Sequence, residues 1–167
     1  KKHYAHDAPP AATLLDAIGE VIRFLGGDRG GLLAVDVKRN TVRPAYGWYH
    51  ESLTERVPDT VNLAEAMPWA AQRVVRDRIP LVVNTLDDLP PEAHRDRASY
   101  VAQGIKSNLV APIVIGGHVR YVISMGALRR EVRWPPSCVC RLQLLGETIA
   151  NTLERRRAIA ALRVSER

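Results

Sequence analysis

Hydrophobic residues near the N-terminus recur at intervals of three and four positions, which is the spacing of an amphipathic helix. The stripe runs up to Gly26-Gly27, and glycine accepts the left-handed backbone geometry that ends many helices. This segment is therefore predicted to be a helix, and its apolar stripe contains Leu14, Leu15, Ile18, Val21, Ile22 and Leu25.

Two apolar segments follow this helix, residues 31–37 and 42–48, and a polar turn separates them. Such a pattern predicts a β-hairpin. Pro44 lies inside the second segment and has no N–H to donate. The second strand is therefore expected at a sheet edge or beside a bulge.

The middle of the chain predicts shorter elements that are separated by prolines. Residues 64–78 predict a helix that begins near Pro68 and turns its valines inward. Residues 79–85 predict a short strand, and residues 91–103 predict another helix, which stops at Gly104.

The most apolar stretch, residues 107–127, predicts two long strands joined by a tight turn at Gly116-Gly117. Alternate residues of a strand point to opposite faces, and here both faces are apolar. The hairpin is therefore expected at the centre of a sheet that is covered on both sides, with a bulge at Pro112.

Residues 135–167 predict one long helix whose apolar stripe changes face along its length. The first stripe suits packing on the helix's own domain and contains Leu142, Leu145, Ile149 and Leu153. Ile159 and Leu162 lie on a different face, in phase with Leu144. The Arg-rich second half is therefore expected to leave the domain toward a partner.

The order of elements predicts an α+β fold. One antiparallel sheet of five or six strands is expected to carry the terminal helices on one face and the connecting helices on the other. We expect residues 1–10 to be a disordered or linker segment and residues 11–153 to form one domain. Residues 154–167 then begin an output helix that leads toward a following domain.

Composition narrows the function classes. The chain has 167 residues, 46% of them hydrophobic, and a net charge of +6, but its arginines are interspersed with acids and it has a single Phe. These features argue against nucleic-acid binding, and no apolar run is long enough to span a bilayer.

Two cysteines without a disulfide framework favour the cytoplasm. Because the chain begins at Lys1, we expect a segment of a longer protein.

Candidate chemistry is sparse. Cys138 and Cys140 are two positions apart, so they do not share a helix face, and no set of four metal ligands surrounds them. His94 is the only candidate for haem or acid–base work, and an exposed histidine is the simpler interpretation. We find no nucleophile elbow and no phosphate-binding loop. No catalytic residue, metal or cofactor is therefore predicted.

Two stretches, "GIKSNLVAPIVIGGHVRYVISMGAL" and "EVRWPPSCVCRLQLLGETIANTLERRRAIAAL", resemble a GAF domain of the kind found in bacterial sensor histidine kinases. The final residues resemble the linker before a PAS domain. The resemblance implies a sensory module with no catalysis of its own, whose partners are a second copy and the downstream PAS or kinase domains. Pairing through the terminal helices would use Leu15, Ile18, Ile22, Leu142, Leu145, Ile149 and Leu153.

The resemblance also implies a small-molecule pocket between the sheet and the connecting helices. Trp48, Trp69 and Tyr100 are expected to line it, and Asn108 or Ser124 to offer hydrogen bonds. The signatures of cyclic-nucleotide and bilin-binding members are absent, so the ligand is open. Two alternatives are a dimerisation module with a filled pocket and a methionine-sulfoxide reductase, which would need cysteines at the pocket.

Overall fold

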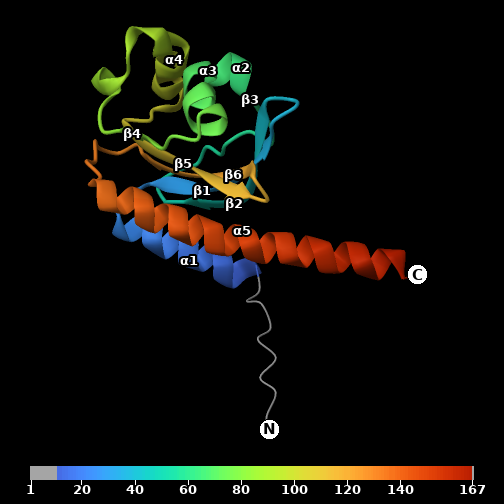
Figure 1. Cartoon of the computed structure of the whole chain (residues 1–167). Helices are drawn as coiled ribbons and strands as arrows, with labels where there is room; N and C mark the ends of the chain where they lie inside the picture. The colour runs from blue at the N-terminus through green and yellow to red at the C-terminus, as the bar shows by residue number, and fades with distance from the viewer. Residues whose placement is uncertain (1–10, 167) are drawn as a thin grey trace.

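The computed structural model describes residues 11–166 and contains one six-stranded antiparallel sheet (Figure 1). The strands are β1 (Arg29–Asp36), β2 (Thr41–Tyr49), β3 (Val61–Asn62), β4 (Leu81–Val83), β5 (Ser107–Ile115) and β6 (His118–Ala127). Their order in the sheet is β3-β2-β1-β6-β5-β4, so the β5–β6 hairpin is central, as its two apolar faces predicted. The expected linker at residues 1–10 lies outside the described residues.

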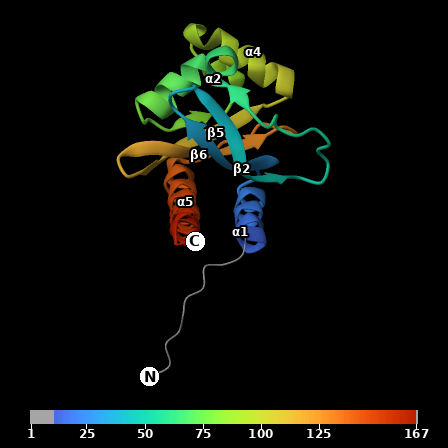
Figure 2. The same ribbon diagram turned by 90° about the vertical axis from the view of Figure 1, so that its right-hand side faces the viewer.

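Helices cover both faces of the sheet. Two long helices, α1 (Ala11–Phe24) and α5 (Pro136–Ser165), lie beside each other on one face (Figure 2). Short segments lie on the other face, and we call them the cover: α2 (Leu63–Ala66), α3 (Pro68–Ala70), the π-helical turn η1 (Ala71–Arg76), and α4 (His94–Gln103) with two short 3-10 turns, η2 (Leu86–Asp88) and η3 (Pro91–Ala93), before it. The predicted α+β fold and its layers are confirmed.

The face beneath α1 and α5 is a close-packed core. Ile18 and Ile22 of α1 and Leu142 of α5 are each 0% exposed and pack on β-strand residues such as Leu32. Gly146 allows α5 to approach the sheet, because a Cβ there would lie 2.8 Å from Ile113 Cδ1. This face therefore anchors α5 firmly to the sheet.

The same packing corrects part of the predicted dimer interface. Ile18, Ile22, Leu142 and Ile149 are 0–1% exposed inside a single chain, so they do not present a surface to a second copy. The sequence shows that these residues lie on an apolar helix face, but it does not show that the sheet of the same chain already covers that face. Leu15, Leu145 and Leu153 remain half-buried at the edges of this packing.

The cover is more broken than the sequence predicted. Residues 64–78 form not one helix but α2, α3 and η1. The chain leaves helical geometry at Met67 (φ −141°, ψ 54°), directly before Pro68, because a proline disfavours helical geometry in the residue that precedes it. The strand predicted at 79–85 keeps only Leu81–Val83, since Arg78 adopts a left-handed φ of 59° and Pro80 follows.

Two bulges bend the central strands. Leu32 pairs with Tyr46 and Leu33 with Pro44, so Ala45 is the extra residue, as expected beside a strand proline. The second bulge lies in β6, where Ile113 pairs with Tyr121 and Val114 with Val119, so Arg120 is the extra residue. The bulge expected at Pro112 itself is wrong, because Pro112 pairs regularly with Val122. β4 pairs with β5 only at residues 108–110, so no strand lies beside Pro112 on that side.

Beyond the sheet, α5 continues as an exposed helix (Figure 1). Tyr121 on β6 donates a hydrogen bond to Glu154 Oε1 at 2.9 Å, near the point where the helix leaves the sheet. Burial of the Tyr121 ring and the bond to Glu154 raise the pKa of Tyr121 above its usual value. From Arg155 to Glu166 nearly every residue is exposed. No helix in residues 11–166 has the length and apolar character that crossing a membrane requires.

Candidate functional site

A cavity of about 160 Å³ lies between the sheet and the cover. Its walls are mostly apolar, and its side and roof are built from α2, α3 and η1 together with the loop after β2. The apolar side chains of these walls include Val57, Val61, Leu63, Met67, Val74 and Val75.

The floor of the cavity is formed by small residues on four neighbouring strands. Across the sheet, Gly47, Gly31, Ser124 and Val110 form one row of paired positions. Gly31 has φ of +150°, and a Cβ there would lie 1.9 Å from the Tyr46 carbonyl oxygen, so only glycine fits this position. Two side-chain-free positions in the row leave the space that the cavity occupies.

The next row is Tyr49, Arg29, Gly126 and Asn108. Gly126 lies beneath the Arg29 side chain, because a Cβ at Gly126 would be 3.8 Å from Arg29 Cγ. Arg29 and Asn108 therefore flank a position with no side chain, two strand spacings or about 10 Å apart.

A chain of hydrogen bonds crosses from the cover to the floor. Asn108 Nδ2 donates to the Tyr100 hydroxyl at 2.9 Å, and Ser124 Oγ donates to Asn108 Oδ1 at 3.5 Å. Tyr100 is 1% exposed, and this burial raises its pKa to about 12 against the opposing bond from Asn108. The three side chains tie α4 to β5 and β6 and give the cavity its polar end.

Hydrogen bonds from α4 hold the neighbouring segments of the cover, in addition to the apolar packing of Val74 on the sheet. Asp96 of α4 is 0% exposed and accepts hydrogen bonds from the backbone N–H groups of Trp69 and Ala70, at 3.1 and 2.8 Å. Ser99 Oγ donates to the Ala66 carbonyl oxygen at 2.6 Å. α4 thus holds α2 and α3 over the cavity, while η1 also packs on the sheet.

Arg29 lies at the mouth of the cavity. It donates a hydrogen bond to Gln103 Oε1 of α4, which joins two residues 74 positions apart. Burial lowers the pKa of Arg29, while Tyr49 and Glu55 act in the opposite direction. Of the described residues that line the cavity, Arg29 alone carries a charge at neutral pH.

Asp28 fixes the strand end from which Arg29 projects. Its carboxylate is nearly inaccessible and accepts bonds from the N–H groups of Leu128 and Arg129 and from Arg129 Nε, at 2.7 to 2.9 Å. Burial opposes ionisation, but these donors outweigh it and hold the pKa of Asp28 below its usual value. The start of β1 is therefore locked to the end of β6.

The structure brings together three of the five residues that were predicted to line a pocket: Tyr100, Asn108 and Ser124. Trp48 is a correction. It packs against Gly19 of α1 on the opposite face of the sheet, with Arg23 above its ring at 5.6 Å. The bulge at Ala45 reverses the alternation of β2, so that Trp48 and Tyr46 face the terminal helices.

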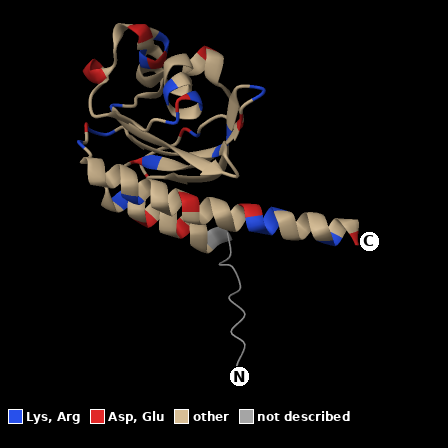
Figure 3. Ribbon diagram, in the orientation of Figure 1, with Lys and Arg blue, Asp and Glu red and all other residues tan. Residues whose placement is uncertain are grey.

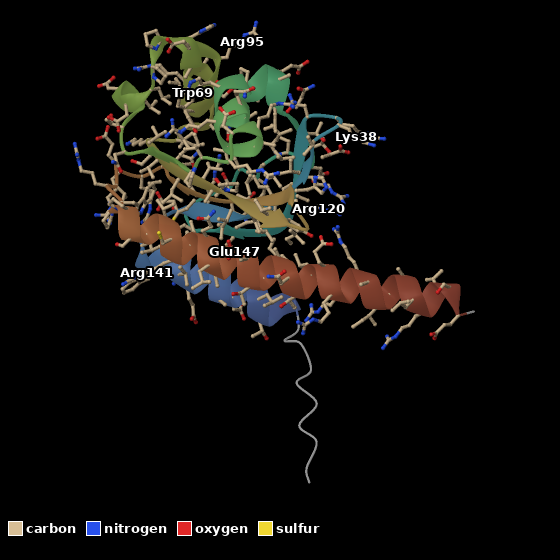
Figure 4. The ribbon with its side chains drawn as sticks, viewed as in Figure 1. Lys38, Trp69, Arg95, Arg120, Arg141 and Glu147 are labelled. Carbon is tan, nitrogen blue, oxygen red and sulfur yellow. The ribbon has the colours of Figure 1, made fainter. Side chains whose placement is uncertain are left out.

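Trp69 lies among the cover helices (Figure 4), but it does not line the cavity. It packs beside Val74 and the end of β4 in a separate small core. Three further lining residues were not predicted from the sequence: Arg29, Gly31 and Gly126. The one signal available was glycine inside the apolar strands "RGGLL" and "SMGAL", since such glycines mark bulges or places that must stay open.

The cysteines lie far from this cavity. Cys138 is buried against the terminal-helix core, and Cys140 is exposed on α5. His94 is exposed at the start of α4. Within residues 11–166, no group of three His, Cys, Asp or Glu side chains is arranged to hold a metal ion.

The fold and the position of the cavity define a class of protein. A family model for the GAF domain matches residues 8–154. The chain belongs to the GAF domain family, whose members are generally sensory modules without catalysis of their own. No curated protein shows a significant sequence match to this chain.

Solved structures share the fold at low sequence identity. The GAF domain of a two-component sensor histidine kinase from Bacillus halodurans superposes with a TM-score of 0.65 at 17% identity, covering 92% of this chain and 99% of that one. The phycoerythrobilin-bound GAF domain of a cyanobacterial phytochrome gives 0.70 at 16%, covering 88% and 89%. The chromophore-binding domain of Stigmatella aurantiaca bacteriophytochrome gives 0.68 at 14%, covering 89% of this chain and 55% of that chain.

Proposed function

We propose that this chain is the small-molecule sensor module of a bacterial two-component histidine kinase and works in the cytoplasm. The observation that carries the proposal is the cavity with its Tyr100–Asn108–Ser124 chain, which joins cover and sheet around an unfilled space. An apolar pocket with a few convergent polar groups is typical of ligand sites. The similarity to the kinase domain from Bacillus halodurans supports the parent class.

Two competing functions are less well supported. A dimerisation module without a ligand would have side chains in the space that the cavity occupies. A methionine-sulfoxide reductase would need a cysteine at the cavity, whereas Cys138 and Cys140 lie on α5, across the sheet from it.

The proposed output is α5. It packs on β5 and β6, the strands that carry Asn108 and Ser124, and then runs past the domain as an exposed helix. Its outer part carries Arg155, Arg156 and Arg157 beside exposed apolar residues (Figure 3). A shift of the floor strands on ligand binding would thus reach the helix that leads toward the downstream PAS or kinase domain.

A second copy is the proposed partner of this outer helix. Four large apolar side chains of α5 are 44–70% exposed, which favours a helical partner: Leu144, Ile159, Leu162 and Val164. Light scattering on the purified protein tests the proposal. We expect a dimer that Leu162→Glu weakens, and a monomer at high micromolar concentration would contradict it.

A thermal-shift screen with small metabolites tests the sensor function. A ligand at a hundredfold excess over its Kd stabilises the fold by about 2.7 kcal/mol. Gly126→Val is the blocking variant, because a Cβ at Gly126 meets no atom closer than 3.8 Å and the rest of the new side chain extends into the floor of the cavity.

The expected result is at least one compound that raises the Tm of the wild type and not that of Gly126→Val. A variant that retains the wild-type Tm without ligand shows that blocking, not unfolding, removed the response. If no compound shifts the wild type, or if the shifts are equal in both proteins, the cavity is not the sensor site.

A further inference from the structure

Arg29 is a partly buried cation that pairs with no carboxylate of residues 11–166. None of the ion pairs between residues 11–166 includes it, and its one side-chain hydrogen bond goes to the neutral Gln103. Glu55 acts on it only at longer range. Taking a guanidinium partly out of water costs free energy that a paired anion would offset. The positive charge of Arg29 therefore lacks a compensating anion within the described part of the chain.

The position of Arg29 relates this unpaired charge to the cavity. Its side chain lies over Gly126, with Asn108 on the far side of the same glycine. The space between them has apolar walls and a polar group at each end. A molecule that fills this space meets a cation at the mouth and the hydroxyl and amide of Tyr100 and Asn108 at the inner end.

We propose that the ligand of this cavity is a small monocarboxylate with an apolar body, whose carboxylate pairs with Arg29. This inference rests on the proposed sensor function and names the chemical class of its ligand. A space of 160 Å³ suits a molecule on the order of ten non-hydrogen atoms. The planar guanidinium can donate two parallel hydrogen bonds to a carboxylate.

A single charge fits the site better than a phosphate does. The cavity offers one cation, whereas a phosphate monoester carries about −1.5 to −2 at neutral pH and would keep uncompensated charge in a mostly apolar space. The backbone of Arg29 is held in place by its neighbour Asp28, whose carboxylate accepts hydrogen bonds from the N–H groups of Leu128 and Arg129 just after β6. The carboxylate of a bound ligand would also link β1 to α4, because the Arg29 guanidinium already donates a hydrogen bond to Gln103 of α4.

Matched acid and amide pairs test the inference. Binding of benzoate and benzamide, cyclohexanecarboxylate and its amide, and hexanoate and hexanamide is measured by isothermal titration calorimetry, with phenyl phosphate as a further arm. Each pair has the same apolar body, so the ratio of Kd values isolates the charge. We expect at least one acid to bind about tenfold to a hundredfold more tightly than its amide.

Three variants assign the effect to Arg29. Arg29→Gln should remove the preference for the acid and leave amide binding unchanged, and Arg29→Lys should keep part of it. Arg43→Gln is the control, because Arg43 is exposed on β2 and does not line the cavity. Circular dichroism confirms that each variant is folded.

The outcomes separate two failures. Equal binding of acid and amide to the wild type overturns the carboxylate inference and leaves the sensor site intact, as does a preference that survives in Arg29→Gln. Tighter binding of phenyl phosphate than of benzoate assigns the site to phosphate esters and also overturns it. If acids and amides bind to Gly126→Val as tightly as to the wild type, the compounds bind elsewhere, and the proposed function fails with the inference.

Discussion

The two faces of the sheet are covered in opposite ways. On one face α1 and α5 bury branched side chains against β-strand residues that are 0% exposed. On the other face, short helices broken at Pro68 span a floor of glycines, Ser124 and Asn108, and a cavity remains. Because side chains alternate along each strand, one residue packs against the terminal helices and the next one faces the cover and its cavity.

The difference assigns stability to one face and, under the proposed function, response to the other. Close-packed interiors transmit small shifts as rigid bodies, whereas loosely anchored segments open at low cost. Within the cover, hydrogen bonds to Asp96 and Ser99 of α4 hold α2 and α3, and two small apolar cores join the cover to the sheet. The terminal helices are held by one large apolar core. Under the proposed function, a ligand would therefore act first on the cover and the floor strands, and the close-packed face would pass the resulting shift to α5 as a rigid body.

The largest expected effect is a difference in stability between substitutions at two neighbouring residues of β1, Leu32 and Leu33. Leu32 is 0% exposed beneath the terminal helices, and Leu33 is half-buried at the cavity. Leu32→Ala should lower the free energy of unfolding by about 2–5 kcal/mol, because it leaves a new void in a close-packed core. Leu33→Ala should cost about 1–2 kcal/mol, since its atoms already border empty space. Urea unfolding measures both, and equal losses would contradict the comparison.

The next effect breaks the anchor of the cover. Asp96→Ala leaves the buried N–H groups of Trp69 and Ala70 without their acceptor, and should cost about 1–3 kcal/mol. Hydrogen exchange should accelerate in α3 and η1 but not in α1 or the first half of α5. Asp96→Asn keeps an acceptor for only one of the two N–H groups and should give an intermediate effect. Uniform acceleration across the chain would show that the two faces do not open separately.

A smaller effect concerns the bond between cover and floor. Tyr100→Phe removes the acceptor of Asn108 Nδ2 and should cost about 0.5–1.5 kcal/mol at neutral pH. The pKa of Tyr100 is raised from 10.0 to about 12, so the folded state retains a proton that the unfolded state loses. Its contribution to stability is therefore complete below pH 10 and is lost as the pH rises toward 12.

Urea unfolding of the wild type and Tyr100→Phe at several pH values from 8 to about 11 measures this dependence. The wild type should lose its advantage over the variant as the pH rises above 10. A difference that stays constant over this range would place the Tyr100 hydroxyl in contact with solvent, contrary to its burial.

The smallest effect lies where α5 leaves the sheet. Tyr121→Phe removes the hydrogen bond to Glu154 and should cost less than about 1 kcal/mol, because Glu154 is partly exposed. Amide exchange should accelerate after Glu154 while Leu142 and Ile149 stay protected. Val119→Ala, on the same strand but facing the cover, is the control and should leave exchange in α5 unchanged.

Local pattern was enough to predict the layers of the fold. The two-sided apolar character of residues 107–127 indicated a central hairpin, and the change of stripe in the last helix indicated where it leaves the domain. The helix before Gly26-Gly27 was also predicted correctly, and of the two alternatives for the strand with Pro44, an edge or a bulge, the bulge is present. These features follow from side-chain periodicity and from the missing N–H of proline, which act between near neighbours.

The sequence by itself therefore determined the long elements, the layers and the polar residues Asn108 and Ser124, but not the broken helices between Leu63 and Arg76. Only the tertiary structure decided which face each side chain joins and what meets it there. The bulge at Ala45 turned Trp48 toward α1, and the sheet of the same chain covered Ile18 and Leu142. Arg29 takes its place beside the cavity because it pairs with Gly126, about a hundred residues away, and donates to Gln103, 74 residues away. Strand register and helix docking set such contacts, and no local spacing records them.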